Sequence, residues 1–183
     1  MALTINNWNC MLKNKLLLFL STILFSHLAW SADLCNSSEV AVFSCQLKEN
    51  KKIVSLCSSK YLSAKTGYLQ YRYGSADKIE LKYPSTLTES QAGFGYDSYS
   101  RSDLSTFILG FNISNYRYEI SETTEGGQDD GTTLRALLVS SIDKKHDLKL
   151  TCLDNANLTS NISTLEDVVP CDKKHEIVEG SCS

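Results

Sequence analysis

The sequence lacks the residue patterns of the common metal and catalytic sites. It has no C-x-x-C pair, and beyond position 32 it has only two histidines, His146 and His175. The ligands of a structural zinc site are therefore not supplied. There is also no G-x-S-x-G segment, which excludes the serine nucleophile elbow of the α/β-hydrolases. We expect no metal, no other cofactor and no enzyme of these classes.

A membrane-spanning hydrophobic run is also missing. The main apolar run, residues 16–25, follows two lysines and precedes a segment of small residues. It is about half of the roughly 20 residues that a spanning helix needs, and this order of segments is that of a secretory signal. The sequence predicts a cleaved leader over 1–32, with cleavage after Ser31 or Ala32 and with Met11 as an alternative start. No stable membrane insertion is expected after cleavage.

The chain has no excess of basic residues. Loss of the two leader lysines leaves 16 of the 18 Lys and Arg residues against 21 acidic residues, a net charge of −5. Nucleic-acid surfaces carry clustered positive charge, so a nucleic-acid partner is not expected. A basic protein partner is favoured instead.

Six cysteines follow the leader, and an even number in an exported chain indicates up to three disulfides. The spacing leaves the pairing open, although the last two can close a short loop in the tail. The expected disulfide cysteines are Cys35, Cys45, Cys57, Cys152, Cys171 and Cys182.

Alternation of apolar and polar residues recurs between residues 40 and 153, and no long helical repeat competes with it. We therefore predict an all-β fold, an antiparallel sandwich or small barrel of about eight strands, stabilised by disulfides. Cys152 falls on the buried face of the last strand. The expected strands are 40–47, 53–58, 69–73, 79–83, 107–111, 116–120, 134–140 and 148–152.

Two stretches interrupt this rhythm. Residues 84–103 form a polar and aromatic connection of a length that is uncommon unless it is functional or contains an unrecognised element. Residues 154–183 form a short C-terminal tail in which 164–169 has the pattern of a single helical turn. The predicted organisation is a leader at 1–32, a β-rich domain at 33–153 and a disulfide-tethered tail at 154–183.

The 84–103 connection carries the best candidates for a binding site. Tyrosine and arginine are enriched at binding hot spots, and a rigid β-scaffold commonly presents its contacts on a loop. The candidate contact residues are Gly93, Phe94, Tyr96, Tyr99 and Arg101.

No catalytic residues are predicted. A pair of glycosidase carboxylates assembles only in space, so this alternative stays open. The acidic segment 122–131 lacks the alternating oxygen ligands and the closing Glu of an EF-hand, and we interpret it as a hairpin loop.

Two series of residues resemble known proteins. The opening Val42-Phe-Ser-Cys45, Val54-Ser-Leu-Cys57 and Leu69-Gln-Tyr-Arg-Tyr-Gly74, with Tyr116-Arg-Tyr118 and Leu148-Lys-Leu-Thr-Cys152 further on, resembles a set of uncharacterised bacterial periplasmic β-rich proteins. This resemblance covers about residues 40–153. It implies the periplasm of a Gram-negative bacterium and implies no activity.

The segment Ala92-Gly93-Phe94-Gly95-Tyr96 distantly resembles the S-G-x-x-Y loop of the periplasmic inhibitors of C-type lysozyme. Those inhibitors are small eight-stranded barrels, and in them the loop contacts the enzyme. Ala92 stands here where that family has its functional serine.

The sequence thus predicts a periplasmic or secreted binding protein without enzymatic activity. An inhibitor or immunity factor against a basic, cell-wall-active enzyme is the leading hypothesis. The alternatives are an envelope hydrolase that uses carboxylates and an envelope structural or interaction subunit.

Overall fold

Strands make up nearly all of the regular secondary structure in the described part of the chain, and each of the eight expected strands is present. The protein is described by a computed structural model covering residues 33–126, 131–141, 143 and 145–182. The expected leader at 1–32 and the centre of the acidic 122–131 segment lie outside the described residues. Within the described part of the chain, no helix has the length and apolar character needed to cross a membrane.

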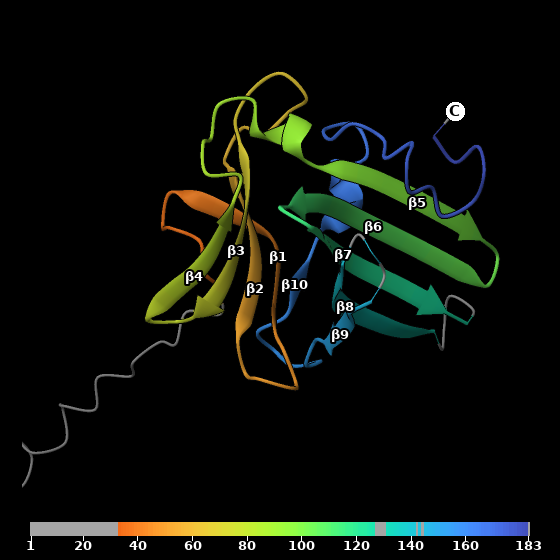
Figure 1. Ribbon diagram of the computed structural model, residues 1–183, viewed down its shortest axis with the longest axis horizontal. Coiled ribbons are helices and arrows are strands. Elements are labelled where there is room, and N and C mark those ends of the chain that lie inside the picture. The colour runs from red at the N-terminus through yellow and green to blue at the C-terminus, as the bar shows by residue number, and fades with distance from the viewer. Residues whose placement is uncertain (1–32, 127–130, 142, 144, 183) are drawn as a thin grey trace, which may run out of the picture. The chain divides into compact units, whose positions relative to one another are not determined.

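The first sheet contains five antiparallel strands (Figure 1). Its strands are β1 (Glu39–Gln46), β2 (Ile53–Ser59), β3 (Leu69–Ser75), β4 (Lys78–Tyr83) and the short β10 (Thr159–Ser160). Their order across the sheet is β10-β1-β2-β3-β4. The expected hairpin between the first two strands is confirmed, because Gln46 pairs with Ile53 at its closed end.

The second sheet also contains five antiparallel strands, which follow one another in chain order. Its strands are β5 (Gly95–Arg101), β6 (Leu104–Ile113), β7 (Tyr116–Glu125), β8 (Thr132–Ser141) and β9 (Asp147–Thr151). The nearly apolar segment that forms β8 lies between two neighbouring strands, as its composition indicates.

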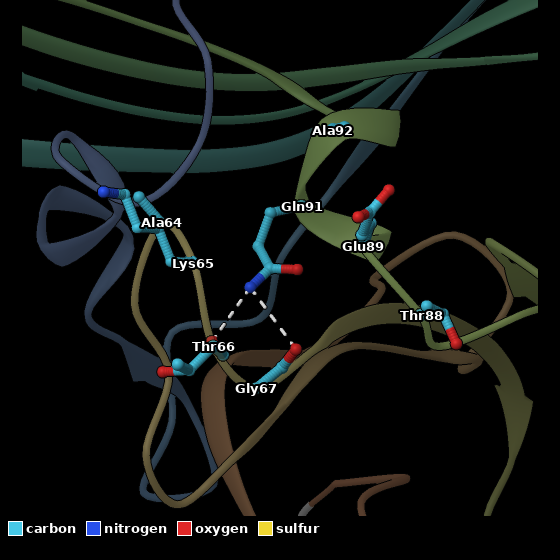
Figure 2. A pocket seen from close by; sticks show the side chains of 8 residues that line it. All are labelled: Ala64, Lys65, Thr66, Gly67, Thr88, Glu89, Gln91 and Ala92. Atoms are coloured by element: carbon cyan, nitrogen blue, oxygen red, sulfur yellow. Dashed lines mark hydrogen bonds between the residues drawn. The ribbon is translucent and has the colours of Figure 1, made fainter.

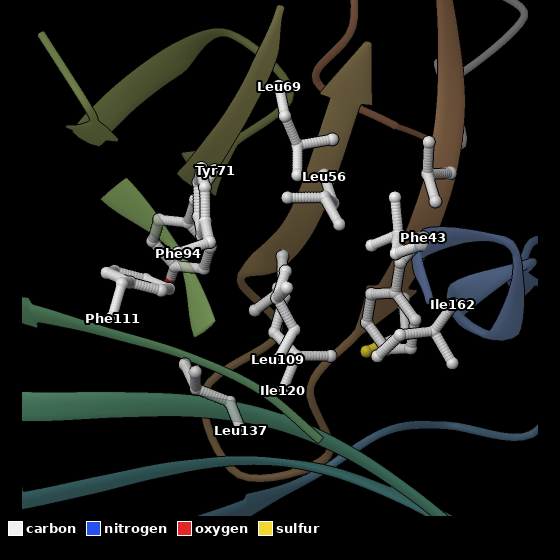
Figure 3. Packing of buried hydrophobic residues seen from close by; sticks show 14 of the residues in the cluster. Phe43, Leu56, Leu69, Tyr71, Phe94, Leu109, Phe111, Ile120, Leu137 and Ile162 are labelled. Atoms are coloured by element: carbon white, nitrogen blue, oxygen red, sulfur yellow. The ribbon is translucent and has the colours of Figure 1, made fainter. Parts of the chain in front are cut away.

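The two sheets pack together as a sandwich. The apolar side chains of the alternating pattern fill the space between them (Figure 3). Leu109, Ile120, Leu137 and Leu150 are cross-strand neighbours on β6 to β9, and all four are buried. Burying each such leucine or isoleucine contributes about 1.5–3 kcal/mol. Rows of this kind fix the register, because a shift by one residue turns every apolar side chain outward.

Three disulfides form from the six expected cysteines. They join Cys35 to Cys57, Cys45 to Cys152 and Cys171 to Cys182. The second links residues 107 positions apart. It lies at the corner where Leu47 pairs with Cys152 and the two sheets meet.

The 84–103 stretch contains an unrecognised element, which was one of the two alternatives for a connection of this length. It contains a short 3₁₀ helix, η1 (Ser90–Gly93), and the whole of β5. The strand pattern is concealed because Asp97, on the face opposite Tyr96, is polar and yet only 2% exposed. The C-terminal segment covers this face, so a polar residue is buried where alternation would predict an exposed one.

The C-terminal segment 154–182 is packed into the sandwich. Strand β10 pairs with β1, and the 3₁₀ helix η2 (Ile162–Leu165) buries Ile162 and Leu165 in the core. This helix begins two residues before the expected turn. The chain then runs beside β5, where the Tyr96 N–H donates to the Pro170 carbonyl at 2.9 Å.

Candidate binding groove

Two adjoining hollows lie between the β2–β3 loop, η1 and the segment that follows η2. The larger has a volume of about 580 Å³ and is lined from the loop and from residues 88–92 (Figure 2). The smaller, of about 310 Å³, shares Ala64, Gln91 and Ala92 and extends to residues 166–170. We call the joined hollows the acidic groove and define it by residues 64–67, 88–92 and 166–170.

Gln91 holds one wall of the acidic groove in place. Its side chain is buried, and its Nε2 donates to the carbonyl of Ser63 at 2.9 Å. It also donates to the carbonyls of Thr66 at 3.0 Å and Gly67 at 3.4 Å (Figure 2). The loop needs glycine at position 67, where φ is 79° and a Cβ would approach the Tyr61 carbonyl to 2.8 Å. The β2–β3 loop is therefore a fixed wall of the groove.

The exposed charges of the acidic groove are mostly negative. Glu89, Glu166 and Asp167 are exposed around it against one cation, Lys65. Glu89 also has a φ of 50°, a left-handed conformation that is uncommon for a residue other than glycine. Such backbone strain concentrates at ligand clamps and other functional positions. A fixed, recessed and negatively charged surface suits a cationic ligand.

The five candidate contact residues do not form one surface. Phe94 and Tyr96 are buried, at 4% and 3% exposure, and burial raises the pKa of Tyr96 to about 12. Gly93 and Tyr99 are half-buried and Arg101 is exposed. The five residues extend from the end of η1 to the end of β5. Of these, only Gly93 adjoins the groove.

Packing explains the aromatic residues of this segment. The Phe94 ring lies edge-on to Tyr83 and Phe111, with ring centroids 5.5 and 5.4 Å away. The Tyr83 hydroxyl donates to the Gly93 carbonyl at 3.0 Å. The resemblance at 92–96 therefore falls on a segment whose two aromatic side chains lie in the core.

Sequence reasoning missed the acidic groove because its parts are distant in the chain. Glu89 and Glu166 are separated in sequence by the whole of the second sheet and carry no common motif. The one signal was the small-residue and glycine content near 64–67 and 92–93, which marks turns and close approach.

The least exposed carboxylates are held by structural partners, and Asp97 accepts from the Ile177 N–H and the Ser181 hydroxyl. Glu39 is paired with Arg72, Glu122 with Arg135 and Asp172 with Arg117. Gly110 makes room for the Arg117 pair, because a Cβ there would lie 2.0 Å from the guanidinium.

Hydrogen bonding lowers the pKa values of the carboxyl groups that are shifted in the described chain. Burial alone would raise the pKa of Asp172, but His175 and Arg117 together hold it below its ordinary value. Glu39, Glu49, Asp77 and Asp143 also have lowered pKa values. A general acid that works near neutral pH needs the opposite shift, so these groups do not fit the hydrolase alternative.

Two clusters of potential ligand atoms occur among the described residues. One joins Glu39 to Cys35 and Cys57, and the other joins Asp97 to Cys171 and Cys182. In both, the sulfur atoms are already bonded to each other as disulfides. Metals bind the thiolate form of cysteine, so neither cluster supplies a metal-ligand set.

Comparison of this chain with protein families, with curated protein sequences and with solved structures finds no match.

Proposed function

We propose that this chain is an exported binding domain without catalytic activity that holds a basic protein segment in the acidic groove. The observation that carries the proposal is the set of three exposed acids, Glu89, Glu166 and Asp167, around a groove whose β2–β3 wall is held by Gln91. The three disulfides fit an oxidising, extracytoplasmic environment. Within that environment we propose the periplasm.

A cell-wall-active enzyme is the partner class that we favour. An enzyme that acts on an anionic polymer carries positive charge around its cleft, and a rigid acidic surface is complementary to it. A preorganised groove also loses little conformational entropy on binding. The proposed role is therefore that of an inhibitor or immunity factor, with C-type lysozyme as the first probe.

The test compares a groove variant with a variant of equal charge change elsewhere. Glu89→Lys/Glu166→Lys reverses two groove charges, and Glu125→Lys/Glu179→Lys reverses two exposed charges outside the groove. Binding to lysozyme and inhibition of its action on peptidoglycan are measured by calorimetry and by a turbidity assay. We expect the groove variant to bind at least about 30-fold more weakly, a loss of about 2 kcal/mol. The control variant should stay within about twofold of the wild type.

Two results would contradict the proposal. Equal losses in both double variants would show that only net charge matters. The absence of binding to lysozyme and to other wall hydrolases at concentrations of about 100 µM would remove the partner class, because that corresponds to less than about 5.5 kcal/mol of affinity.

A further inference from the structure

The outer edge of β9 is open over part of its length. Strand β9 pairs with β8 alone, in a ladder whose ends are marked by two hydrogen bonds. The Cys152 N–H donates to the Arg135 carbonyl and the Ser141 N–H donates to the His146 carbonyl, each at 2.9 Å. Main-chain groups in an antiparallel ladder point alternately toward and away from the partner strand. The main-chain N–H and carbonyl groups of residues 148 and 150 therefore point toward β8, and those of residues 147, 149 and 151 point away from it.

The contacts of Thr151 confirm this alternation and set the limit of the open edge. Its N–H donates to both carboxylate oxygens of Glu49 at 3.0 Å, and its carbonyl accepts from the Lys48 N–H at 2.8 Å. The outward groups of Thr151 are thus used within the chain. The N–H and carbonyl groups of Asp147 and Lys149 remain directed to solvent.

The other outer strands differ from β9 in the described part of the chain. The tail covers β5 around Tyr96, and β10 is two residues long. Strand β4 also has an open edge, but Lys52 holds its Glu80 at 2.6 Å and the remaining charges on it are those of two lysines, Lys78 and Lys82. Strand β9 is the open edge that carries charges of both signs outside any ion pair.

Its sequence is complementary to itself. In an antiparallel pair of two β9 strands centred on Leu148, Asp147 of each copy faces Lys149 of the other. Both residues are outward-facing, so the two pairs exchange four main-chain hydrogen bonds. Their side chains project from the same face of the sheet, which places opposite charges side by side. The two Leu148 side chains, each 53% exposed in the single chain, meet on the other face.

We propose that β9 is a pairing edge for a second copy of this chain, joining two second sheets across a two-fold axis. This two-fold contact uses the same patch on both subunits, as the commonest dimers do. The proposal is independent of the acidic groove, since no residue of β9 lines that groove. It gives the chain the open strand edge expected of an envelope interaction subunit.

The test is the mass of the oxidised chain in solution, measured by sedimentation equilibrium. We expect a dimer at micromolar concentration. Asp147→Lys places lysines opposite each other and should weaken the dimer at least about tenfold. The exchanged pair Asp147→Lys/Lys149→Asp should restore it, because opposite charges then meet again.

Two further variants separate pairing from folding. Lys149→Pro removes an N–H that faces away from β8, so the fold tolerates it while two intermolecular hydrogen bonds are lost. Lys82→Glu on the other outer strand changes charge without touching β9, and it should leave the dimer unchanged. A wild-type chain that is monomeric at about 100 µM would overturn the proposal. So would a dimer that neither Asp147→Lys nor Lys149→Pro weakens.

Discussion

The buried pair between Arg72 and Glu39 gives the sharpest stability prediction. The guanidinium of Arg72 donates two hydrogen bonds of 2.7 Å to the carboxylate of Glu39, and the two side chains are 4% and 1% exposed. Glu39 also accepts from the Asn36 N–H at 2.6 Å and from the Tyr68 hydroxyl at 2.9 Å. Arg72→Met keeps much of the volume but leaves a buried carboxylate without its cation. We expect a loss of about 3–5 kcal/mol in the free energy of unfolding, out of a total of about 5–15 kcal/mol for a domain.

The assay is urea denaturation at pH 7 of the wild type, Arg72→Met, Glu39→Leu and the double variant. Because the double variant removes both charges together, it should be more stable than the sum of the single losses predicts. The coupling energy should be about 2 kcal/mol or more. A loss below about 1 kcal/mol for Arg72→Met, typical of a surface pair, would refute the reasoning, as would additive single losses.

The same pair predicts a pH dependence. Burial alone would raise the pKa of Glu39, but hydrogen bonds from Arg72, Asn36 and Tyr68 outweigh burial and lower it below 4.5. A carboxyl whose pKa is lower in the folded than in the unfolded state adds stability above its unfolded pKa. That contribution is lost as pH falls through the folded value. The stability difference between the wild type and Glu39→Leu should therefore be constant from pH 7 to about 5 and shrink below about pH 4.

Two further predictions concern buried oxygen atoms. Asp97→Ala removes the acceptor of the Ser181 hydroxyl and the Ile177 N–H. Hydrogen exchange followed by mass spectrometry should then show amide exchange in 171–182 at least about tenfold faster, with the core strands still protected. Tyr71→Phe removes a hydroxyl that has no partner among the described residues, and urea denaturation should show a gain of about 1 kcal/mol; a loss would mean that the hydroxyl is hydrogen-bonded.

Strands that have one apolar face could be predicted from the sequence because burial imposes a period of two. Ile120 and Leu150 illustrate this, since each lies between two polar residues in the sequence and both are buried in one row with Leu137. Strand β5 was hidden because the face bearing Asp97 is covered by a segment about 80 residues away in the chain. The local sequence pattern does not show that a distant segment covers this face.

The acidic groove and the disulfide pairing were beyond prediction for a related reason. Both depend on which distant segments become neighbours, as Cys45 and Cys152 do at the corner of the sandwich. A cysteine count fixes the number of possible bridges and leaves the pairing to the topology. The second sheet lies between Glu89 and Glu166 in the sequence. The two acids therefore come to line one groove only once that sheet has folded.

Two segments that flank the strands, residues 33–38 and 170–182, explain why polar residues are buried on the outer faces of both sheets. Residues 33–38 lie over the first sheet, where the Leu34 N–H donates to Ser55 Oγ and the Leu34 carbonyl accepts from Arg72. Residues 170–182 lie over the second sheet, where Arg117 and Asp97 hold them. Each segment is also tied down by one disulfide, Cys35–Cys57 or Cys171–Cys182.

This arrangement restricts where a partner can bind. An outer sheet face that already pairs its polar groups with a flanking segment of the chain gains little from a second partner, since those hydrogen bonds would have to be broken first. The acidic groove and the β9 edge instead keep exposed charges or free main-chain groups in the described chain. Reduction of Cys171–Cys182 would loosen the cover over β5 and leave both of these surfaces intact. Binding through the groove and pairing through β9 should therefore survive loss of the tail disulfide, whereas a partner recognised through the tail would not.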